Sequence, residues 1–208
     1  MNMVTILKHP LLQSKMAILR DKNTGTKDFK EVVDEIGMLV TYEITRNLET
    51  KTVKIETPLE VTDCEVVASD VLIVPILRAG LGMVDGIRRV IPNAKIGHIG
   101  LYRNEKTLIP VEYYFKLPPI TENTTCLLVD PMLATGNSCN KGIELLRKAG
   151  VKNITYVGLV GCPQGIKAVQ DINPDVDIYL VDCDRELNDH GYILPGLGDC
   201  GDRLFGTK

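Results

Sequence analysis

The sequence predicts an α/β fold with a central, mainly parallel sheet flanked by helices. From residue 71 onward, short runs rich in β-branched residues alternate with helical patterns. These runs are almost continuously apolar, which is typical of strands buried on both faces of a sheet. The chain has 208 residues, of which 44% are hydrophobic and 25% are charged, the balance of an ordinary globular protein. We therefore expect one domain covering residues 1–208.

The first part of the chain reads as helical, which predicts helices ahead of the sheet. Thr26 is the expected N-cap of one of them, because a threonine hydroxyl can accept a hydrogen bond from a first-turn N–H. Apolar residues then recur along one helical face: Phe29, Val32, Val33, Ile36, Val40 and Ile44.

Five strands and three helices are expected to follow. The strands lie at 71–77, 95–101, 125–130, 154–160 and 178–181, and the helices lie near 81–91, 138–149 and 165–171. Gly150 suits the end of the second of these helices. Strands that alternate with helices predict parallel βαβ connections and a sheet covered on both faces.

Two segments interrupt this alternation. Residues 102–122 contain three prolines and an aromatic patch at 113–115, and a connection this long is often a functional lid. We consider two interpretations, a hood over the site or a peripheral hairpin on the sheet edge. The second segment is the tail, residues 188–208, which is rich in glycine and contains Pro195.

Residues 126–138, CLLVDPMLATGNS, lead from the end of a buried strand into a helix. A helix N-terminus offers unpaired amides and partial positive charge to a phosphate. Thr135 and Ser138 add hydroxyl donors, Gly136 lets the backbone come close, and Asp130 can accept from sugar hydroxyls. The arrangement suits a phosphorylated ribose, so we call residues 130–138 the phosphate loop. The competing interpretation is an ordinary strand–loop–helix turn that binds nothing.

The segment VDPMLATGNS resembles the signature of type I phosphoribosyltransferases, and its DPMLATG form resembles the uracil-specific branch. Pro131 replaces the second of two acidic residues usual in the family, and Asn137 stands where the branch commonly has glycine. Because asparagine tolerates positive φ better than most residues, we expect the loop to be retained. The resemblance implies phosphoribosyl diphosphate binding by Asp130, Pro131, Met132, Leu133, Ala134, Thr135, Gly136, Asn137 and Ser138.

The tail contains GYILPGLGDCGD, in which Gly196, Gly198 and Gly201 form a literal G-x-G-x-x-G. A dinucleotide site is excluded, because that pattern needs a strand before it and a helix after it within a βαβ unit. Glycine-rich backbone can instead present N–H and C=O groups to a planar base such as uracil. From composition alone, a loose C-terminus is an equal alternative.

The tail also resembles the uracil site of uracil phosphoribosyltransferases. This resemblance implies that the base contacts Ile193, Gly198, Asp199 and Cys200. Asp199 would also face the ribose diphosphate and its metal. Cys200 stands where alanine is usual, and it would meet uracil through its backbone.

Two arginines follow predicted strands. Arg78, in VPILRAGLGMVDG, lies before a helix opened by Gly80 and Gly82, and Arg103 begins the long segment 102–122. A guanidinium in such a place suits pyrophosphate. The other interpretation of each is a solvated surface arginine. The family resemblance, which spans nearly the whole chain, implies that both contact the diphosphate and that Asp130, Asp199 and Arg103 are catalytic.

Composition limits the partners. The formal net charge of −3 provides no strong field toward nucleic acid or membrane. The start lacks a signal-peptide pattern, and the six cysteines form no CxxC pair, so a cytoplasmic protein is expected. The family resemblance implies Mg²⁺ held through the substrate and a homodimer or higher homo-oligomer. Some members are activated by GTP, for which no residue here identifies a site.

The function expected from this resemblance is transfer of a phosphoribosyl group to uracil, giving UMP and diphosphate in pyrimidine salvage. One alternative is a nucleotide-sensing regulator of the same fold that binds RNA, which would need a basic face. Another is an enzyme of this fold that acts on a different base, such as a purine.

Overall fold

The protein is described here by a computed structural model covering residues 3–103 and 110–207. Its main sheet follows the order β1-β11-β10-β8-β4-β6-β7, with β5 beside β4 and β9 beside β10. All pairs are parallel except β6–β7. The strands are β1 (Val4–Ile6), β4 (Asp70–Leu77), β5 (Lys95–Ile96), β6 (His98–Arg103), β7 (Pro110–Lys116), β8 (Thr124–Val129), β9 (Met132–Leu133), β10 (Asn153–Gly161) and β11 (Asp177–Cys183). The predicted mainly parallel sheet is confirmed.

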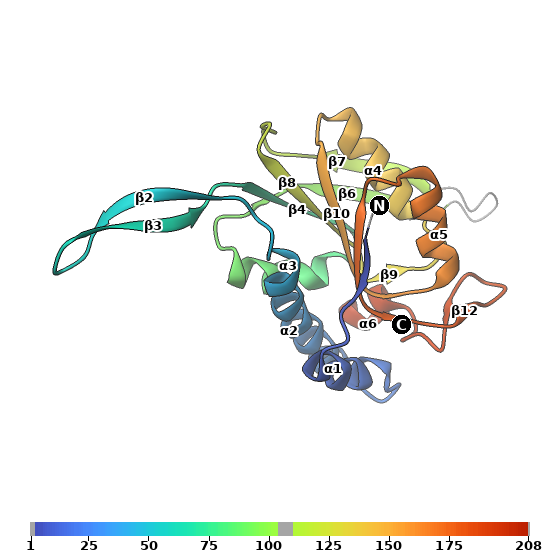
Figure 1. Ribbon diagram of the computed structural model, residues 1–208. Helices are drawn as coiled ribbons and strands as arrows, with labels where there is room; N and C mark the ends of the chain where they lie inside the picture. Colours follow the sequence, from blue (N-terminus) through green and yellow to red (C-terminus); the bar gives the residue numbers. More distant parts are fainter. Residues whose placement is uncertain (1–2, 104–109, 208) are drawn as a thin grey trace.

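Helices cover both faces of this sheet (Figure 1). On one face lie α1 (Pro10–Arg20), α2 (Thr26–Ile44) and α3 (Leu81–Val90), and on the other lie α4 (Asn137–Lys148) and α5 (Pro163–Ile172). Successive residues of β4 enter opposite cores, since Ile73 packs with the α2 side and Leu72 with the α4 side. Among the described helices, none is long and apolar enough to cross a membrane.

The start of α2 differs by one residue from the prediction. Thr26 is the first helical residue, and Gly25 is the N-cap, without a side-chain cap hydrogen bond. Gly25 has extended backbone and its carbonyl oxygen accepts from the Phe29 N–H at 2.9 Å. The predicted cap is therefore wrong, because the chain enters the helix at the preceding residue. The apolar face from Phe29 to Val40 is buried as expected.

The predicted strand at 95–101 is two short strands, β5 and β6. The break falls at Gly97, whose N–H donates to the Ile73 carbonyl at 3.0 Å. A Cβ atom there would lie 2.4 Å from the side chain of Leu117. Close packing at this edge therefore interrupts the strand, but both halves keep the same register against β4, with Leu72 opposite Lys95 and Ile76 opposite Ile99.

Within the long segment 102–122, strand β7 pairs antiparallel with β6 on the sheet edge. This is the arrangement of the peripheral hairpin considered above. The tip, residues 104–109, lies outside the described residues, so the hood interpretation stays a prediction.

A second antiparallel hairpin, absent from the predicted elements, joins β2 (Thr50–Glu56) to β3 (Val61–Val67). Figure 1 shows this hairpin, which we call the β-arm, projecting far from the body of the molecule. Its residues are mostly exposed on both faces, and Leu59 in its turn is 94% exposed. The alternation in TKTVKIE and VTDCEVV is the signal that predicts such a pair.

Candidate active site

A cleft of about 390 Å³ opens at the carboxyl ends of β4 and β8. Chain order reverses between these two strands, because β6 lies on one side of β4 and β8, β10 and β11 lie on the other. Ligands of open α/β sheets bind at this kind of switch point. The cleft is lined by Ala79, Asp130, Met132, Ala134, Ser138, His190, Gly191, Tyr192, Ile193, Gly198, Asp199, Cys200 and Gly201.

Asp130 lies directly after β8 and lines the cleft. Its backbone N–H donates to the Val157 carbonyl at 3.1 Å, and its carbonyl accepts from the Tyr156 hydroxyl at 2.7 Å. Burial raises the pKa of its carboxyl to about 7, although a hydrogen bond from the Met132 N–H opposes the shift. The carboxyl is therefore held rigidly in the cleft and is poised to change charge near neutral pH.

The rest of the phosphate loop is attached to β10. Met132 and Leu133 form β9, which pairs with the end of β10, and the Pro131 carbonyl accepts from the N–H groups of Leu159 and Val160. Met132 and Ala134 consequently face the cleft, whereas Pro131 and Leu133 are buried behind it. The loop has little freedom to move against the sheet.

At its end the loop passes through Gly136, which is left-handed with φ +79° and directly precedes α4. A Cβ atom at Gly136 would lie 2.9 Å from the Gly165 carbonyl oxygen of α5. Glycine is therefore needed here for φ and for packing against α5. Asn137 is the first residue of α4 and is exposed on a separate groove along that helix. The loop is retained as expected, but the tolerance of asparagine for positive φ is not the reason, because Asn137 is already helical.

Two residues after β10 support the loop and were not predicted as site residues. Cys162 is fully buried, and its thiol donates to the Ala134 carbonyl at 3.2 Å. A Cβ atom at Gly165 would lie 2.3 Å from the same carbonyl oxygen. The sequence signal for this contact is the segment GCPQG at 161–165. That signal is weak, because a buried cysteine is usually just a small apolar residue.

The loop after β4 reaches the end of β8. A Cβ atom at Gly80 would lie 2.4 Å from the Val129 carbonyl oxygen, next to Asp130. Arg78 is exposed, donates to Asp202 at 3.2 Å and has its guanidinium carbon 5.9 Å from the centre of the Phe205 ring. Its guanidinium therefore lies against the tail, at the cleft's edge. Arg103 ends β6, and its side chain lies outside the described part of the structure.

The tail is ordered by packing, so the alternative of a loose C-terminus is wrong. Strands β12 (Glu186–Leu187) and β13 (Ile193–Leu194) form a small antiparallel pair, followed by the short helix α6 (Cys200–Phe205). Its buried side chains join the core beside α2 and α3: Ile193, Leu197, Cys200 and Leu204. Tyr192 and Phe205 remain 43% exposed.

The segment between β13 and α6 faces the cleft with its backbone. Gly196 and Gly198 are left-handed, with φ +63° and +80°. Within the described part of the chain, the N–H and C=O of the exposed Gly198 have no hydrogen-bond partner. Asp199 caps α6 by accepting from the Asp202 N–H at 2.9 Å, and its exposed carboxylate lines the cleft. Free backbone groups and a carboxylate thus meet at one place.

The structure brings most predicted residues of both segments into one cleft and adds five neighbours. Three of these, Gly191, Tyr192 and Gly201, belong to the quoted tail motif, and Ala79 follows Arg78. Only His190 carries no sequence signal, because an isolated histidine in a polar loop resembles a solvated one. The arrangement combines a helix N-terminus for a phosphate, a carboxyl for a sugar, and backbone for a planar group.

Comparisons with known proteins agree on one family. A family model described as uracil phosphoribosyltransferase matches residues 6–207. Relatives named uracil phosphoribosyltransferase include those of Lactobacillus gasseri and Acholeplasma laidlawii, both 57% identical, and one of Clostridium perfringens at 58%. Each alignment covers 100% of this chain and of the relative. The regulator alternative finds no support among them.

Solved structures agree on the fold. A protein from Aquifex aeolicus is 33% identical, with a TM-score of 0.95 over 99% of both chains. An adenine phosphoribosyl transferase from Trypanosoma brucei is 14% identical, with a TM-score of 0.58 over 90% of this chain and 86% of its own. At that identity the likeness shows only the shared fold, which is the type I phosphoribosyltransferase fold that the sequence predicts.

Proposed function

The chain belongs to the uracil phosphoribosyltransferase family, and on that premise we propose how its cleft carries out the transfer. The reaction moves the phosphoribosyl group of phosphoribosyl diphosphate to uracil, giving UMP and diphosphate. The observation that carries the proposal is the meeting of Asp130, the start of α4 and the tail in one cleft. Each supplies a group suited to one part of the two substrates.

In this proposal the ribose phosphate binds the phosphate loop. The first amides of α4 have no intrahelical acceptor, and the helix dipole favours an anion there. Thr135 and Ser138 add hydroxyl donors. Asp130 lies at the other end of the loop and accepts hydrogen bonds from the ribose hydroxyls. The rigid attachment of the loop to β10 supports this role, because little ordering is needed on binding.

The diphosphate binds on the opposite side, near Arg78. In the free protein the Arg78 guanidinium donates to Asp202 and the Arg78 side chain is 54% exposed, so it can turn toward an anion. Arg103 is proposed as a second diphosphate contact on the basis of the family resemblance. Two guanidinium groups would stabilise the negative charge that develops on the leaving group.

Uracil binds against the tail, in contact with Ile193, Gly198, Asp199 and Cys200. The unpartnered N–H and C=O of Gly198 support this assignment, since uracil presents alternating donors and acceptors on its edge. A base nitrogen then attacks C1 of the ribose while diphosphate leaves, and positive charge develops on the sugar ring. The nearby carboxyl of Asp130, when ionised, stabilises that charge. Positioning of the two substrates supplies much of the remaining acceleration.

Mg²⁺ is proposed to enter with the substrate. No group of three or more histidine, cysteine, aspartate or glutamate side chains in the described residues could hold a metal, so these residues offer no complete cage. Asp199 lines the cleft with an exposed carboxylate, and hard oxygen ligands of this kind fit Mg²⁺ together with substrate phosphates. When bound, the ion would neutralise charge on the diphosphate.

A homodimer or higher homo-oligomer is also proposed, with the β-arm as a contact. An isolated two-stranded hairpin is marginally stable in water, and this one exposes Ile55, Leu59, Val61, Val66 and Val67. Activation by GTP through assembly follows from the family resemblance alone. Sedimentation with and without GTP tests both ideas, and a Leu59→Lys variant is expected to shift the protein toward monomer.

A cytoplasmic location is proposed as well. All six cysteines, each within the described residues, are free thiols, as expected in a reducing compartment.

One assay tests the proposed chemistry. Purified protein with phosphoribosyl diphosphate and Mg²⁺ is given uracil, cytosine, orotate or hypoxanthine, and diphosphate release is measured. We expect release with uracil alone. Release with hypoxanthine instead would contradict the assignment of the tail to uracil, and no release with any base would contradict the proposed activity.

A further inference from the structure

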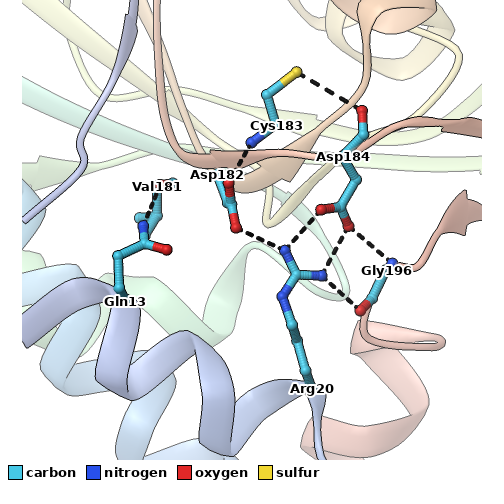
Figure 2. A network of polar contacts seen from close by, with 7 residues as sticks. All are labelled: Gln13, Arg20, Val181, Asp182, Cys183, Asp184 and Gly196. Carbon is cyan, nitrogen blue, oxygen red and sulfur yellow. Dashed lines mark hydrogen bonds and ion pairs between the residues drawn. The ribbon is translucent and has the colours of Figure 1, made fainter. Parts of the chain in front are cut away.

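Arg20, the last residue of α1, reaches across to the tail (Figure 2). One of its terminal nitrogens donates to Asp184 and to the Gly196 carbonyl, and the other donates to Asp182 and Asp184, each at 2.8 Å. Four acceptors from two separate segments therefore converge on one guanidinium. Its rigid fork suits this geometry, which a lysine ammonium does not reproduce.

Asp184 completes the contact from the side of the sheet. It follows β11, is 8% exposed, and accepts the Gly196 N–H at 2.8 Å with the same oxygen that binds Arg20. Arg20 and Asp184 thus hold both polar groups of the Gly196 backbone, as Figure 2 shows. Gly196 itself has no room for a side chain, because a Cβ atom would lie 2.2 Å from the Ile193 carbonyl oxygen.

A second arginine, which belongs to the tail, binds the backbone at the end of α1. Arg203 of α6 donates to the Leu197 carbonyl at 2.8 Å, to the Asp21 carbonyl at 2.6 Å and to the Leu19 carbonyl. Its guanidinium carbon lies 4.3 Å from the centre of the Phe29 ring, close enough for a cation–π contact. We call Arg20, Asp184 and Arg203 the arginine clasp.

The clasp fixes the backbone at 196 and 197, immediately before the residues assigned to uracil. Gly198, whose own N–H and C=O are free within the described part of the chain, follows directly. Residues 195–199 form an irregular loop with two left-handed glycines. Without the contacts of the clasp nothing regular would hold this loop, and ordering a glycine-rich segment costs much conformational entropy. A base bound by such a loop would have to order it first, which weakens binding.

We propose that Arg20, Asp184 and Arg203 are positioning residues that hold the tail backbone ready for uracil. The inference rests on the proposed assignment of uracil to the tail. In the described structure no hydrogen bond or ion pair joins the side chains of the clasp to the phosphate loop, so we expect the clasp to act on one substrate and not on the other. Its loss should therefore raise KM for uracil and leave KM for phosphoribosyl diphosphate nearly unchanged.

The experiment compares steady-state kinetics of Asp184→Asn, Arg20→Lys and Arg203→Lys with the unmodified full chain. Asp184→Asn keeps the side-chain shape but removes the charge that binds Arg20 and Gly196 together. We expect KM for uracil to rise about tenfold, equivalent to about 1.4 kcal/mol, with KM for phosphoribosyl diphosphate within twofold. The two lysine variants keep the positive charge and lose the fork, and we expect the same selective rise.

Gln13 provides the matched control. Gln13 lies on the same helix as Arg20, and its side-chain amide donates to the carbonyl of Val181 in β11 at 3.1 Å. It therefore connects α1 to the sheet, but it does not reach the tail (Figure 2). Gln13→Met should leave both KM values within twofold. If it raises KM for uracil as much as Arg20→Lys does, general docking of α1 explains the effect and the clasp proposal is overturned.

A tail variant separates failure of the clasp from failure of the uracil assignment. Gly198→Ala strains the left-handed backbone at the proposed base contact and should raise KM for uracil. If Gly198→Ala has this effect and folded clasp variants leave KM for uracil unchanged, the clasp proposal is wrong and the assignment stands. If none of them alters KM for uracil, the base does not bind the tail. A clasp variant that raises both KM values equally also overturns the inference.

Discussion

The phosphate loop and the tail line the same cleft, yet they are held in place differently. The loop is attached through regular structure, with β9 paired to β10 and α4 beginning at its end. The tail is held by side chains from distant segments, chiefly Arg20 and Asp184 acting on Gly196. The difference teaches that the proposed phosphate site is built locally on a strand and a helix, whereas the proposed backbone site for uracil depends on long-range contacts.

The two regions also differ in the groups they offer. The loop presents an ionisable carboxyl, Asp130, together with hydroxyls and helix amides. The tail presents mainly backbone groups, whose hydrogen bonding is independent of side-chain identity and of pH. Substitutions in the loop should therefore alter activity by changing the charge or the hydrogen-bonding groups offered to the substrate. Substitutions in the tail should do so mainly by changing the backbone geometry.

The largest expected effect is on the loop. Asp130→Asn keeps the size of the side chain and removes its charge, so it should lower kcat/KM for phosphoribosyl diphosphate about 100-fold, or about 2.7 kcal/mol. Steady-state rates measure this, and thermal unfolding checks that the variant is folded. Turnover within threefold of the unmodified protein at low phosphoribosyl diphosphate would exclude the ribose role.

The pH dependence should separate the two regions. Burial raises the pKa of Asp130 to about 7, and only the ionised carboxylate accepts from two ribose hydroxyls. At pH 6 most free protein must lose a proton to bind, so KM for phosphoribosyl diphosphate should fall about tenfold between pH 6 and pH 8. KM for uracil should stay flat, because the backbone of the tail does not titrate over this range.

The Asp130→Asn variant is the control for this profile, since it retains only the ionisation of the substrate itself. A profile for phosphoribosyl diphosphate that is equally steep in the variant would show that Asp130 is not the titrating group.

A pair of left-handed glycines at the two ends of α4 tests the rigidity of the loop. A Cβ atom at Gly136 meets the Gly165 carbonyl, whereas Gly150, with φ +92°, has no neighbour within 4 Å among the described residues. Gly150→Ala should cost about 1 kcal/mol of unfolding free energy from backbone strain alone. Gly136→Ala should cost about 3 kcal/mol and raise KM for phosphoribosyl diphosphate about fivefold.

Chemical denaturation and kinetics on the two variants measure these effects. Equal costs in both would mean that α5 yields easily to the added methyl group, and that the loop is less rigid than its contacts imply.

The smallest expected effect is at Cys200 in the tail. Its side chain is buried at 2% exposure, and the proposed contact with uracil is through its backbone. Cys200→Ala should leave KM for uracil within twofold and reduce the unfolding free energy by about 1 kcal/mol. A tenfold rise in that KM, measured on a folded variant, would show that the thiol contacts the base and that the backbone account is incomplete.

Deletion of the tail, by contrast, is a poor test of its role. Ile193, Leu197, Cys200 and Leu204 belong to the core beside α2 and α3, so a chain ending at Asn188 would lose packing as well as the proposed uracil site. A loss of activity on truncation would therefore not distinguish unfolding from loss of a substrate contact. Single substitutions within the clasp make the distinction.

Local pattern predicted the buried strands of the sheet and the strand–loop–helix turn at 126–138, while the phosphate role of that turn was favoured by the family resemblance. Apolar runs such as VLIVPIL determine which segments are buried on both faces, and the DPMLATGNS segment between a strand and a helix indicates where a phosphate can bind. These features depend on residues close together in the chain, where propensity and periodicity carry the information. The β-arm has comparable alternation, but both its faces are exposed, so no apolar face marked it as part of the sheet.

Tertiary structure alone decided how the tail is held. The sequence around Gly196 does not predict Arg20 or Asp184 as its partners, because these residues are 176 and 12 positions away in the chain. It also decided that Gly136 takes a positive φ and packs against α5, while Asn137 is already helical. The sequence by itself determined the buried strands, the helices between them and eight of the thirteen residues that line the cleft. The contacts that hold the backbone there depend on which distant segments the fold brings together, which local periodicity does not encode.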